Sequence, residues 1–219
     1  MPFAASGQEF GQASIAQSWN VEADYPTTGN LGIDGAVREW LGRNISERLK
    51  EYAGVAVNPS YRGGTWDMTV EYVTSMSSDR TVSFVFETMV SPSGAAHPMS
   101  YVDVLSFDAE SGDAIELDDM FADPDRALAI MAEHARDLIV RDMGVSAPQL
   151  EESLTGDAWF EKGLLPTREN YASLVLIPEG VLVVFQKYQV LPYVYGFPEA
   201  IFTLDMLEEA GPNKALWGK

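Results

Sequence analysis

The chain has 219 residues, of which 33 are acidic and 14 basic, so its formal net charge is -19 at pH 7. Nucleic acid and anionic membranes are disfavoured as partners, because phosphate contacts need clustered lysine and arginine. A cationic partner is electrostatically easier, although the acidity alternatively serves only to keep an exposed protein soluble. There is no cysteine, which excludes disulfides, thiol catalysis and zinc–thiolate sites, and no apolar run long enough to predict a membrane span.

The chain opens with residues 1–13, which are small and polar and are predicted to form a flexible N-terminus. This start lacks the charged region and apolar core of a signal peptide, so either the protein is cytoplasmic or its export signal is absent from this sequence. Alternating apolar side chains over 14–25 predict a strand. A helix is expected over 33–52, where apolar residues recur at spacings of three and four: Ile33, Val37, Trp40, Leu41, Ile45 and Leu49.

The middle of the chain is rich in strand patterns. Residues 66–75 and 81–89 alternate apolar and polar side chains across a short polar turn, which predicts an antiparallel hairpin. After a loop at 91–98, residues 100–108 predict another strand, and a turn leads from it into a returning extended segment at 114–117. These strands indicate a largely antiparallel sheet.

The second helix has the clearest boundaries. Asp123 suits the N-cap and Pro124 the first helical position, and Gly144 supplies the C-terminal stop. A further short helix is expected near 147–154. The apolar face of the second helix consists of Leu128, Met131, Ala135 and Leu138.

The last part of the chain predicts a second hairpin. Its strands are 174–177 and 181–188, and Pro178 and Gly180 suit the turn between them, with Gly180 in a left-handed position. An aromatic turn follows, and residues 201–204 return to an extended strand. The order strand, helix, strands, helix, strands predicts an α+β fold with mainly antiparallel sheets and two principal helices.

Few residues suggest chemistry. The acidic residues between Asp108 and Asp119 could hold calcium, but the glycine falls at position five instead of the EF-hand's position six, which favours an exposed hairpin turn. His134 lies within the second helix, where a structural or solvent-facing role is expected. His97 lies in a loop, where it either contacts a ligand or fixes the loop through a hydrogen bond. No catalytic motif or cofactor-binding motif is present, so neither an enzyme nor a cofactor is predicted.

The aromatic turn holds the other candidate residues. Tyrosine and phenylalanine rings gather around Pro192, Gly196 and Pro198. Such rings suit stacking on a sugar or anchoring a protein partner, or they fold inward and cover the core. Including His97, the candidate ligand-binding residues are His97, Tyr188, Tyr193, Tyr195, Phe197 and Glu199.

Two passages resemble a bacterial domain of unknown function. That domain closes the extracytoplasmic part of RsiV-type lysozyme-sensing anti-sigma factors and accompanies the catalytic domain of PdaC-type peptidoglycan deacetylases. In the first passage the matching residues are Gly94, Ala96, His97, Pro98, Phe107, Asp108, Gly112, Leu117, Asp119 and Phe121. In the second they are Pro178, Gly180, Phe185, Tyr188, Pro192, Tyr193, Gly196 and Leu204. The chain departs from the pattern at Ala95, where glycine is usual, and at Gln186-Lys187, where an acidic residue and a small residue or proline are commoner.

The resemblance implies a two-lobed chain. The expected divisions are a flexible N-terminus at 1–13, an N-terminal α+β lobe at 14–93, a C-terminal RsiV-like α+β lobe at 94–210 and a tail at 211–219. It also implies an extracytoplasmic, non-catalytic binding or sensor-type module that recognises a peptidoglycan-related glycan or a cationic protein such as lysozyme. The alternatives are an enzyme or accessory domain acting on envelope glycans, with His97 and a nearby acid, or a purely structural accessory domain.

Overall fold

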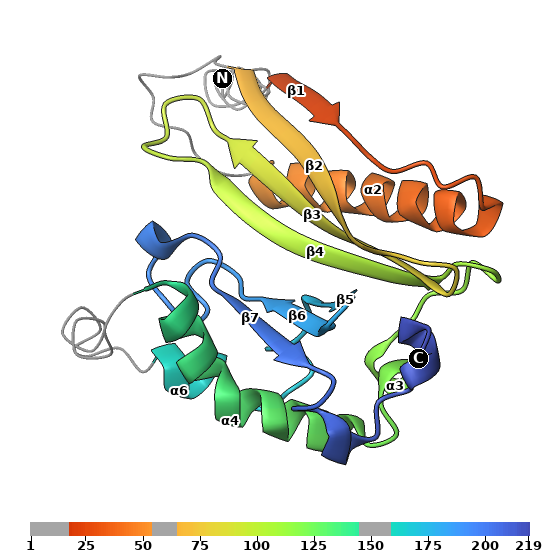
Figure 1. Ribbon diagram of the computed structural model, residues 1–219. Coiled ribbons are helices and arrows are strands. Elements are labelled where there is room, and N and C mark those ends of the chain that lie inside the picture. The colour runs from red at the N-terminus through yellow and green to blue at the C-terminus, as the bar shows by residue number, and fades with distance from the viewer. Residues whose placement is uncertain (1–17, 54–64, 145–158) are drawn as a thin grey trace, which may run out of the picture.

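A computed structural model describes residues 18–53, 65–144 and 159–219 and shows two sheets, each carrying a long helix (Figure 1). The first sheet has the order β1 (Ser18–Ala23), β2 (Thr65–Ser77), β3 (Thr81–Ser91) and β4 (Met99–Asp108). β1 pairs with β2 in parallel, whereas the other two pairs are antiparallel. The expected strand residues 14–17 and the short helix at 147–154 lie outside the described residues.

Helix α2 (Leu31–Tyr52) covers one face of the first sheet. Asn30 caps it, because its side-chain oxygen accepts hydrogen bonds from the amides of Gly32 and Ile33. The apolar stripe predicted from the sequence faces the sheet, and burial of this stripe holds the helix in place. The cluster consists of Ile33, Val37, Trp40, Leu41, Val70, Phe84, Phe86 and Phe107.

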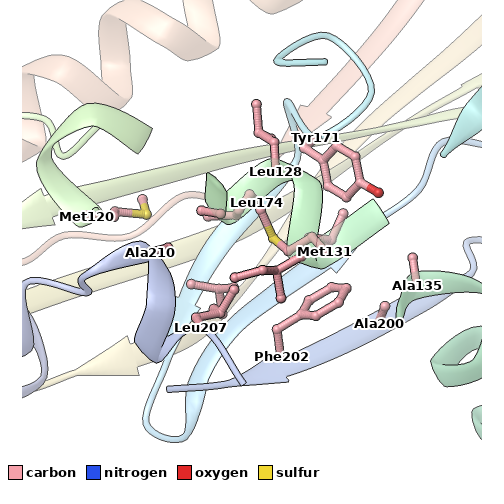
Figure 2. Packing of buried hydrophobic residues seen from close by; sticks show 14 of the residues in the cluster. Met120, Leu128, Met131, Ala135, Tyr171, Leu174, Ala200, Phe202, Leu207 and Ala210 are labelled. Carbon is pink, nitrogen blue, oxygen red and sulfur yellow. The ribbon is translucent and has the colours of Figure 1, made fainter. Parts of the chain in front are cut away.

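The second sheet has the order β5 (Leu174–Ile177), β6 (Gly180–Val184) and β7 (Glu199–Thr203), and both of its pairs are antiparallel. Helix α4 (Pro124–Asp142) packs on it, with the short helices α3 (Leu117–Met120) and α6 (Trp159–Gly163) nearby. Figure 2 shows part of the core between them, in which the apolar face predicted for α4 meets side chains of β5 and β7. Labelled members include Leu128, Met131, Ala135, Leu174, Ala200 and Phe202.

The signals predicted for helix α4 are confirmed. The Asp123 side chain accepts a hydrogen bond from the Arg126 amide at 2.9 Å, and Pro124 begins the helix. After the helix, Gly144 takes a positive φ of 61°, as a left-handed C-terminal stop requires.

Two expectations for strands need correction. The segment at 114–117 makes only an isolated bridge between Phe107 and Ala114, because the chain turns into α3, whose first turn is fixed by a capping box of Glu116 and Asp119. Strand β6 ends at Val184 instead of continuing to residue 188.

Gly180 is needed for the close approach of β6 to β7: a Cβ atom at this position would lie 2.1 Å from the Phe202 carbonyl oxygen on β7.

The two sheets pack against each other. β5 lies against β2, β3 and β4, so the second sheet is held between α4 and the first sheet (Figure 1). The Ser75 hydroxyl donates to the Leu176 carbonyl on β5 at 3.0 Å, so a polar side chain joins the two sheets in addition to the apolar packing. The Thr81 hydroxyl donates at 2.8 Å to the carbonyl of Leu216, which lies in the C-terminal segment.

The end of the chain differs from the tail expected at 211–219. Leu216 and Trp217 are buried, and the Trp217 indole donates to the carbonyls of Ile177 and Gly180 at 2.9 and 3.0 Å. Two apolar side chains and an indole donor with buried acceptors explain why this segment packs against the core.

The α+β fold with mainly antiparallel sheets, two principal helices and two lobes is confirmed. By hydrogen bonding, β4 belongs to the first sheet, although it lies within the range 94–210 expected for the C-terminal lobe. The two sheets are therefore divided after Asp108. Among the described residues, no helix is long and apolar enough to cross a membrane.

Candidate functional site: an aromatic pocket beside strand β4

A pocket with a volume of about 310 Å³ lies between strand β4 and the segment that follows β6. This volume is at the lower end of the range for ligand pockets, about 300–1,000 Å³. Helix α2 contributes one lining residue, β4 contributes five, and the segment after β6 contributes four. They are Arg48; Met99, Ser100, Tyr101, Val102 and Asp103; and Gln186, Lys187, Tyr188 and Tyr193.

The segment after β6 has an unusual backbone where it reaches the pocket. Tyr188 has a φ of 67°, and it is the only residue other than glycine with a positive φ in the described part of the chain. Bulky residues rarely adopt this conformation, and such strain often accompanies functional sites. A 3₁₀ turn, Tyr193–Tyr195, then ends at Gly196, which has a φ of 70°. These turns place Tyr188 and Tyr193 at the pocket while the chain returns to β7.

Aromatic rings form one side of the pocket. The rings of His97 and Tyr193 have centroids 4.3 Å apart, and those of Tyr188 and Tyr193 are 5.8 Å apart. Trp159 stacks beside Tyr188 at 6.2 Å. The Tyr193 hydroxyl donates to the Pro98 carbonyl at 3.0 Å, which ties the 91–98 loop to the aromatic turn.

A cation lies over this group of rings. The Lys187 ammonium is 4.7 Å from the centroid of the Tyr193 ring and 4.6 Å from that of Phe197. A cation over an aromatic face is attracted by the electron density of the ring. Lys187 therefore helps to fix the orientation of both rings.

Polar side chains form the other side of the pocket. The Asp103 carboxylate accepts a hydrogen bond from Asn44 Nδ2 at 3.0 Å. Burial raises the pKa of Asp103, while the positive charge of Arg48 opposes this rise. The Arg48 guanidinium lies 3.8 Å from the centroid of the Tyr101 ring and pairs with Glu51.

The hydroxyl of Tyr101 is held in its neutral form. Burial, together with hydrogen bonds to Tyr52 and Glu51, raises the pKa of Tyr101. The hydroxyl donates to Glu51 Oε1 at 3.0 Å. Two contacts thereby fix the Tyr101 side chain: Arg48 lies over the face of its ring, and Glu51 accepts a hydrogen bond from its hydroxyl.

Gln186 closes part of the edge of β4. The Val102 amide donates to Gln186 Oε1 at 3.1 Å, and Gln186 Nε2 donates to the Val102 carbonyl and to the Ser173 hydroxyl. The side-chain amide thus pairs with Val102 as the backbone of a neighbouring strand would. A carboxylate at this position could accept from the Val102 amide but, when ionised, could not donate to its carbonyl.

The structure brings together some of the residues predicted for the site and places others elsewhere. His97, Tyr188 and Tyr193 come together, and Phe197 joins them through Lys187. Tyr195 instead packs against the core of the second sheet, as the alternative of inward-facing rings predicted for it. Glu199 begins β7, where it is exposed, and it does not line the pocket.

Sequence reasoning missed Arg48, Tyr101, Asp103 and the pairing of Gln186. These residues come from α2, β4 and the turn after β6, and no local motif connects them. One signal was available: Tyr101 and Asp103 have the same parity in a predicted strand, so they lie on the same face. That face points toward α2, where Asn44 and Arg48 lie.

The other chemical candidates are structural. The carboxylate of Asp108 accepts from the amides of Glu110 and Ser111 at 2.9 Å each and lies 3.7 Å from Arg80, which makes it part of a turn. His134 is exposed on α4. Over residues 18–53, 65–144 and 159–219, no three His, Cys, Asp or Glu side chains come together in a way that could hold a metal ion.

These features describe a two-sheet α+β protein with a small aromatic pocket between its lobes. Residues 118–205, which run from α3 to just beyond β7, match the family described as "Protein of unknown function (DUF3298)". No curated protein matches the chain.

Two solved structures share the fold. One is a DUF3298 family protein from Pseudomonas aeruginosa, with a TM-score of 0.59 and 15% identity over 91% of this chain and 86% of that one. The other is a member of the same family from Bacteroides fragilis, with a TM-score of 0.54 and 16% identity over 84% of this chain and 68% of that one. At these identities the similarity establishes the fold alone.

Proposed function

We propose that the chain is a non-catalytic binding module of the cell envelope, located outside the cytoplasm, that holds a peptidoglycan-related glycan in the aromatic pocket. The observation that carries this proposal is the arrangement of the lining: tyrosine rings on one side, and Asp103, Gln186 and Arg48 on the other. The resemblance of the passages around His97 and Tyr193 to envelope proteins supports the same conclusion.

A sugar ring matches such a lining because it has apolar C–H faces and polar edges. Tyrosine combines a large apolar ring with a polar hydroxyl, so Tyr188 and Tyr193 suit the faces of a sugar. A few polar groups then fix the orientation of the bound ligand. Asp103 and Arg48 provide an acceptor and a donor for hydroxyl groups at the opposite wall.

The contacts of His97 support binding more than catalysis. Its Nδ1 atom lies 3.1 Å from the Pro98 carbonyl oxygen, and its ring lies against Tyr193. A general base needs a positioned partner and a reacting group within hydrogen-bond reach. Among the described residues, the contacts found for His97 involve no carboxylate. We therefore assign His97 to support of the Tyr193 ring.

The experiment that tests the proposal is calorimetric titration of the purified chain with soluble peptidoglycan fragments and with chitotriose, a trimer of N-acetylglucosamine. Chitotriose is neutral, so its binding should be little affected by salt, and binding that persists at physiological ionic strength supports the proposal. No binding of either probe to the folded protein would contradict it.

A cationic protein such as lysozyme is the second candidate ligand, and the net charge of -19 favours it. Opposite charges steer encounter but are screened by salt. Titration with lysozyme at two ionic strengths separates the cases. Binding that weakens only modestly at physiological salt supports a specific complex, whereas binding lost completely there would reduce it to unspecific attraction.

A further inference from the structure

Lys187 is a partly buried cation without a counter-charge. Among the lysine and arginine residues that the structure describes, the partly buried ones are Arg48, Arg126 and Lys187, and all the others are exposed. Each of the two arginines forms an ion pair with a glutamate. Lys187 forms no ion pair with any residue of the described ranges, although the chain carries 33 acidic residues. An unpaired ammonium therefore lines the aromatic pocket.

The other charges of the pocket lining are already matched. Besides Lys187, the charged lining residues are Arg48 and Asp103. The Arg48 guanidinium pairs with Glu51, and its positive charge also acts on the Asp103 carboxylate. Opposite charges therefore lie together on the side of the pocket formed by α2 and β4. Lys187, in the segment after β6, is left as the unbalanced charge.

Two rings hold the Lys187 ammonium without neutralising it. The ammonium lies 4.7 Å from the centroid of the Tyr193 ring and 4.6 Å from that of Phe197. An aromatic face attracts a cation, but the ring has no net charge. An ammonium has three donors, and hydrogen bonds from a charged donor to a charged acceptor are the strong ones. Lys187 is thus a positioned donor that an anionic group of a ligand would satisfy.

We propose that Lys187 binds a carboxylate carried by the glycan, so that the pocket prefers acidic amino sugars to neutral ones. N-acetylmuramic acid, which is N-acetylglucosamine with a lactyl ether, is a sugar of this class. This inference rests on the proposed glycan-binding function and specifies its substrate class. One unpaired ammonium balances one negative charge, which matches a carboxylate, whereas a phosphate monoester carries about -1.5 to -2 at pH 7.

The position of the charges also orients the ligand. A carboxylate beside Asp103 would be repelled, because like charges at short distance are unfavourable. The acidic end of the sugar therefore lies at Lys187, and its neutral hydroxyl groups lie at the opposite wall. The net charge of -19 acts over longer distances, where salt screens it beyond about 8 Å at physiological ionic strength. A partly buried contact at Lys187 is screened much less.

The first test compares two forms of one ligand on the native chain by calorimetric titration. The ligand is the disaccharide of N-acetylglucosamine and N-acetylmuramic acid, with its lactyl carboxylate either free or converted to the primary amide. The two forms have nearly the same size and differ in charge. We expect the free acid to bind about fivefold more tightly. Equal affinities, or tighter binding of the amide, would overturn this inference and leave the glycan-binding function standing. Absence of binding by both forms would overturn the function and this inference together.

The second test removes the charge from Lys187. Lys187→Met keeps an unbranched apolar side chain beside the rings. Lys219→Met, at an exposed position that does not line the pocket, makes the same change in net charge and is the control. We expect Lys187→Met to abolish the preference for the free acid while its affinity for the amide stays within about twofold of native. Lys219→Met should keep the preference.

Two outcomes of this second test would contradict the proposal. One is a preference for the free acid that persists in folded Lys187→Met. The other is an equal loss of preference in Lys187→Met and Lys219→Met, which would reduce the effect to net charge. If Lys187→Met does not fold, the comparison of the two disaccharides on the native chain decides.

Discussion

At the scale of a single residue, Asp103 places a carboxylate where its ionised form is unfavourable. Its carboxyl is partly buried on β4, and burial raises its pKa above the usual 3.8 despite the nearby Arg48. Asn44 supplies one hydrogen bond. A partly desolvated acceptor of this kind favours a bound ligand over water, and it lowers the stability of the ligand-free fold.

We predict that Asp103→Asn is more stable than the native chain at pH 7. Well below pH 3.8 the native carboxyl is protonated in both the folded and unfolded states and has no effect on stability. As the pH rises from 3.8 to the raised pKa of the folded state, the unfolded state loses its proton first and the folded state becomes less stable relative to it. The stability gained by Asp103→Asn should therefore disappear at low pH. Urea unfolding across this range tests it, with the exposed Asp205→Asn as the control. A less stable Asp103→Asn at pH 7 would mean that attraction to Arg48 outweighs burial.

The residues also show how far the sequence could predict the site. Tyr188 and Tyr193 were predicted from the aromatic turn and His97 from the separate loop at 91–98, and the structure brings the three rings together. Tyr195 has the same residue type two positions later, yet it packs against the core of the second sheet and does not line the pocket. Residue type alone does not distinguish Tyr193 from Tyr195. The difference depends on backbone geometry, which the sequence does not show directly.

At the scale of elements, two glycines differ in whether the fold has room for a side chain. At Gly180 a Cβ atom would lie 2.1 Å from the Phe202 carbonyl oxygen, so β6 can pair with β7 only if this position has no side chain. Gly42 is exposed in the middle of α2, and a Cβ atom there would meet nothing within 4 Å. The two positions form a matched pair.

We predict opposite effects for alanine at these two positions. Gly180→Ala should lower the free energy of unfolding by about 1–3 kcal/mol through overpacking. Gly42→Ala should raise it by about 0.5–1 kcal/mol, because alanine loses less backbone entropy in a helix. Denaturant midpoints of both variants test this. Stabilisation by Gly180→Ala would contradict the close approach of β7.

The elements were predictable where their signals are local. Asp123, Pro124 and Gly144 bound α4 as expected because caps and stops act within one helical turn. The predicted end of β6 was wrong because the apolar pattern continues past Val184, whereas the pairing with β7 stops there. Strand ends depend on the partner strand, and the sequence of one strand does not contain that information.

At the scale of the whole molecule, the C-terminal segment joins the lobes. Leu216 accepts a hydrogen bond from Thr81 on β3, while the Trp217 indole donates to carbonyls at the turn between β5 and β6. The sequence predicted a tail because 211–219 has no strand or helix pattern. Its burial depends on partners more than 30 residues away in the chain.

We predict that Trp217→Phe lowers the free energy of unfolding by about 1–3 kcal/mol, because two buried carbonyls lose their donor while most of the apolar area remains. Trp159→Phe is the matched control: within the described residues, the Trp159 indole nitrogen is buried without a hydrogen-bond partner. It should change stability less than Trp217→Phe. Thermal unfolding of both variants tests the comparison, and equal losses would contradict the assigned role of the Trp217 indole.

The central claim is that the pocket beside β4 binds a glycan through its tyrosine rings. The most direct measurement is calorimetric titration of chitotriose into Tyr193→Ala and Val194→Ala, alongside the native chain. Val194 is the adjacent residue and is 82% exposed, so its truncation controls for changes in the turn. We predict about tenfold or greater loss of affinity for Tyr193→Ala and affinity within about twofold of native for Val194→Ala. Native affinity in folded Tyr193→Ala would contradict the claim.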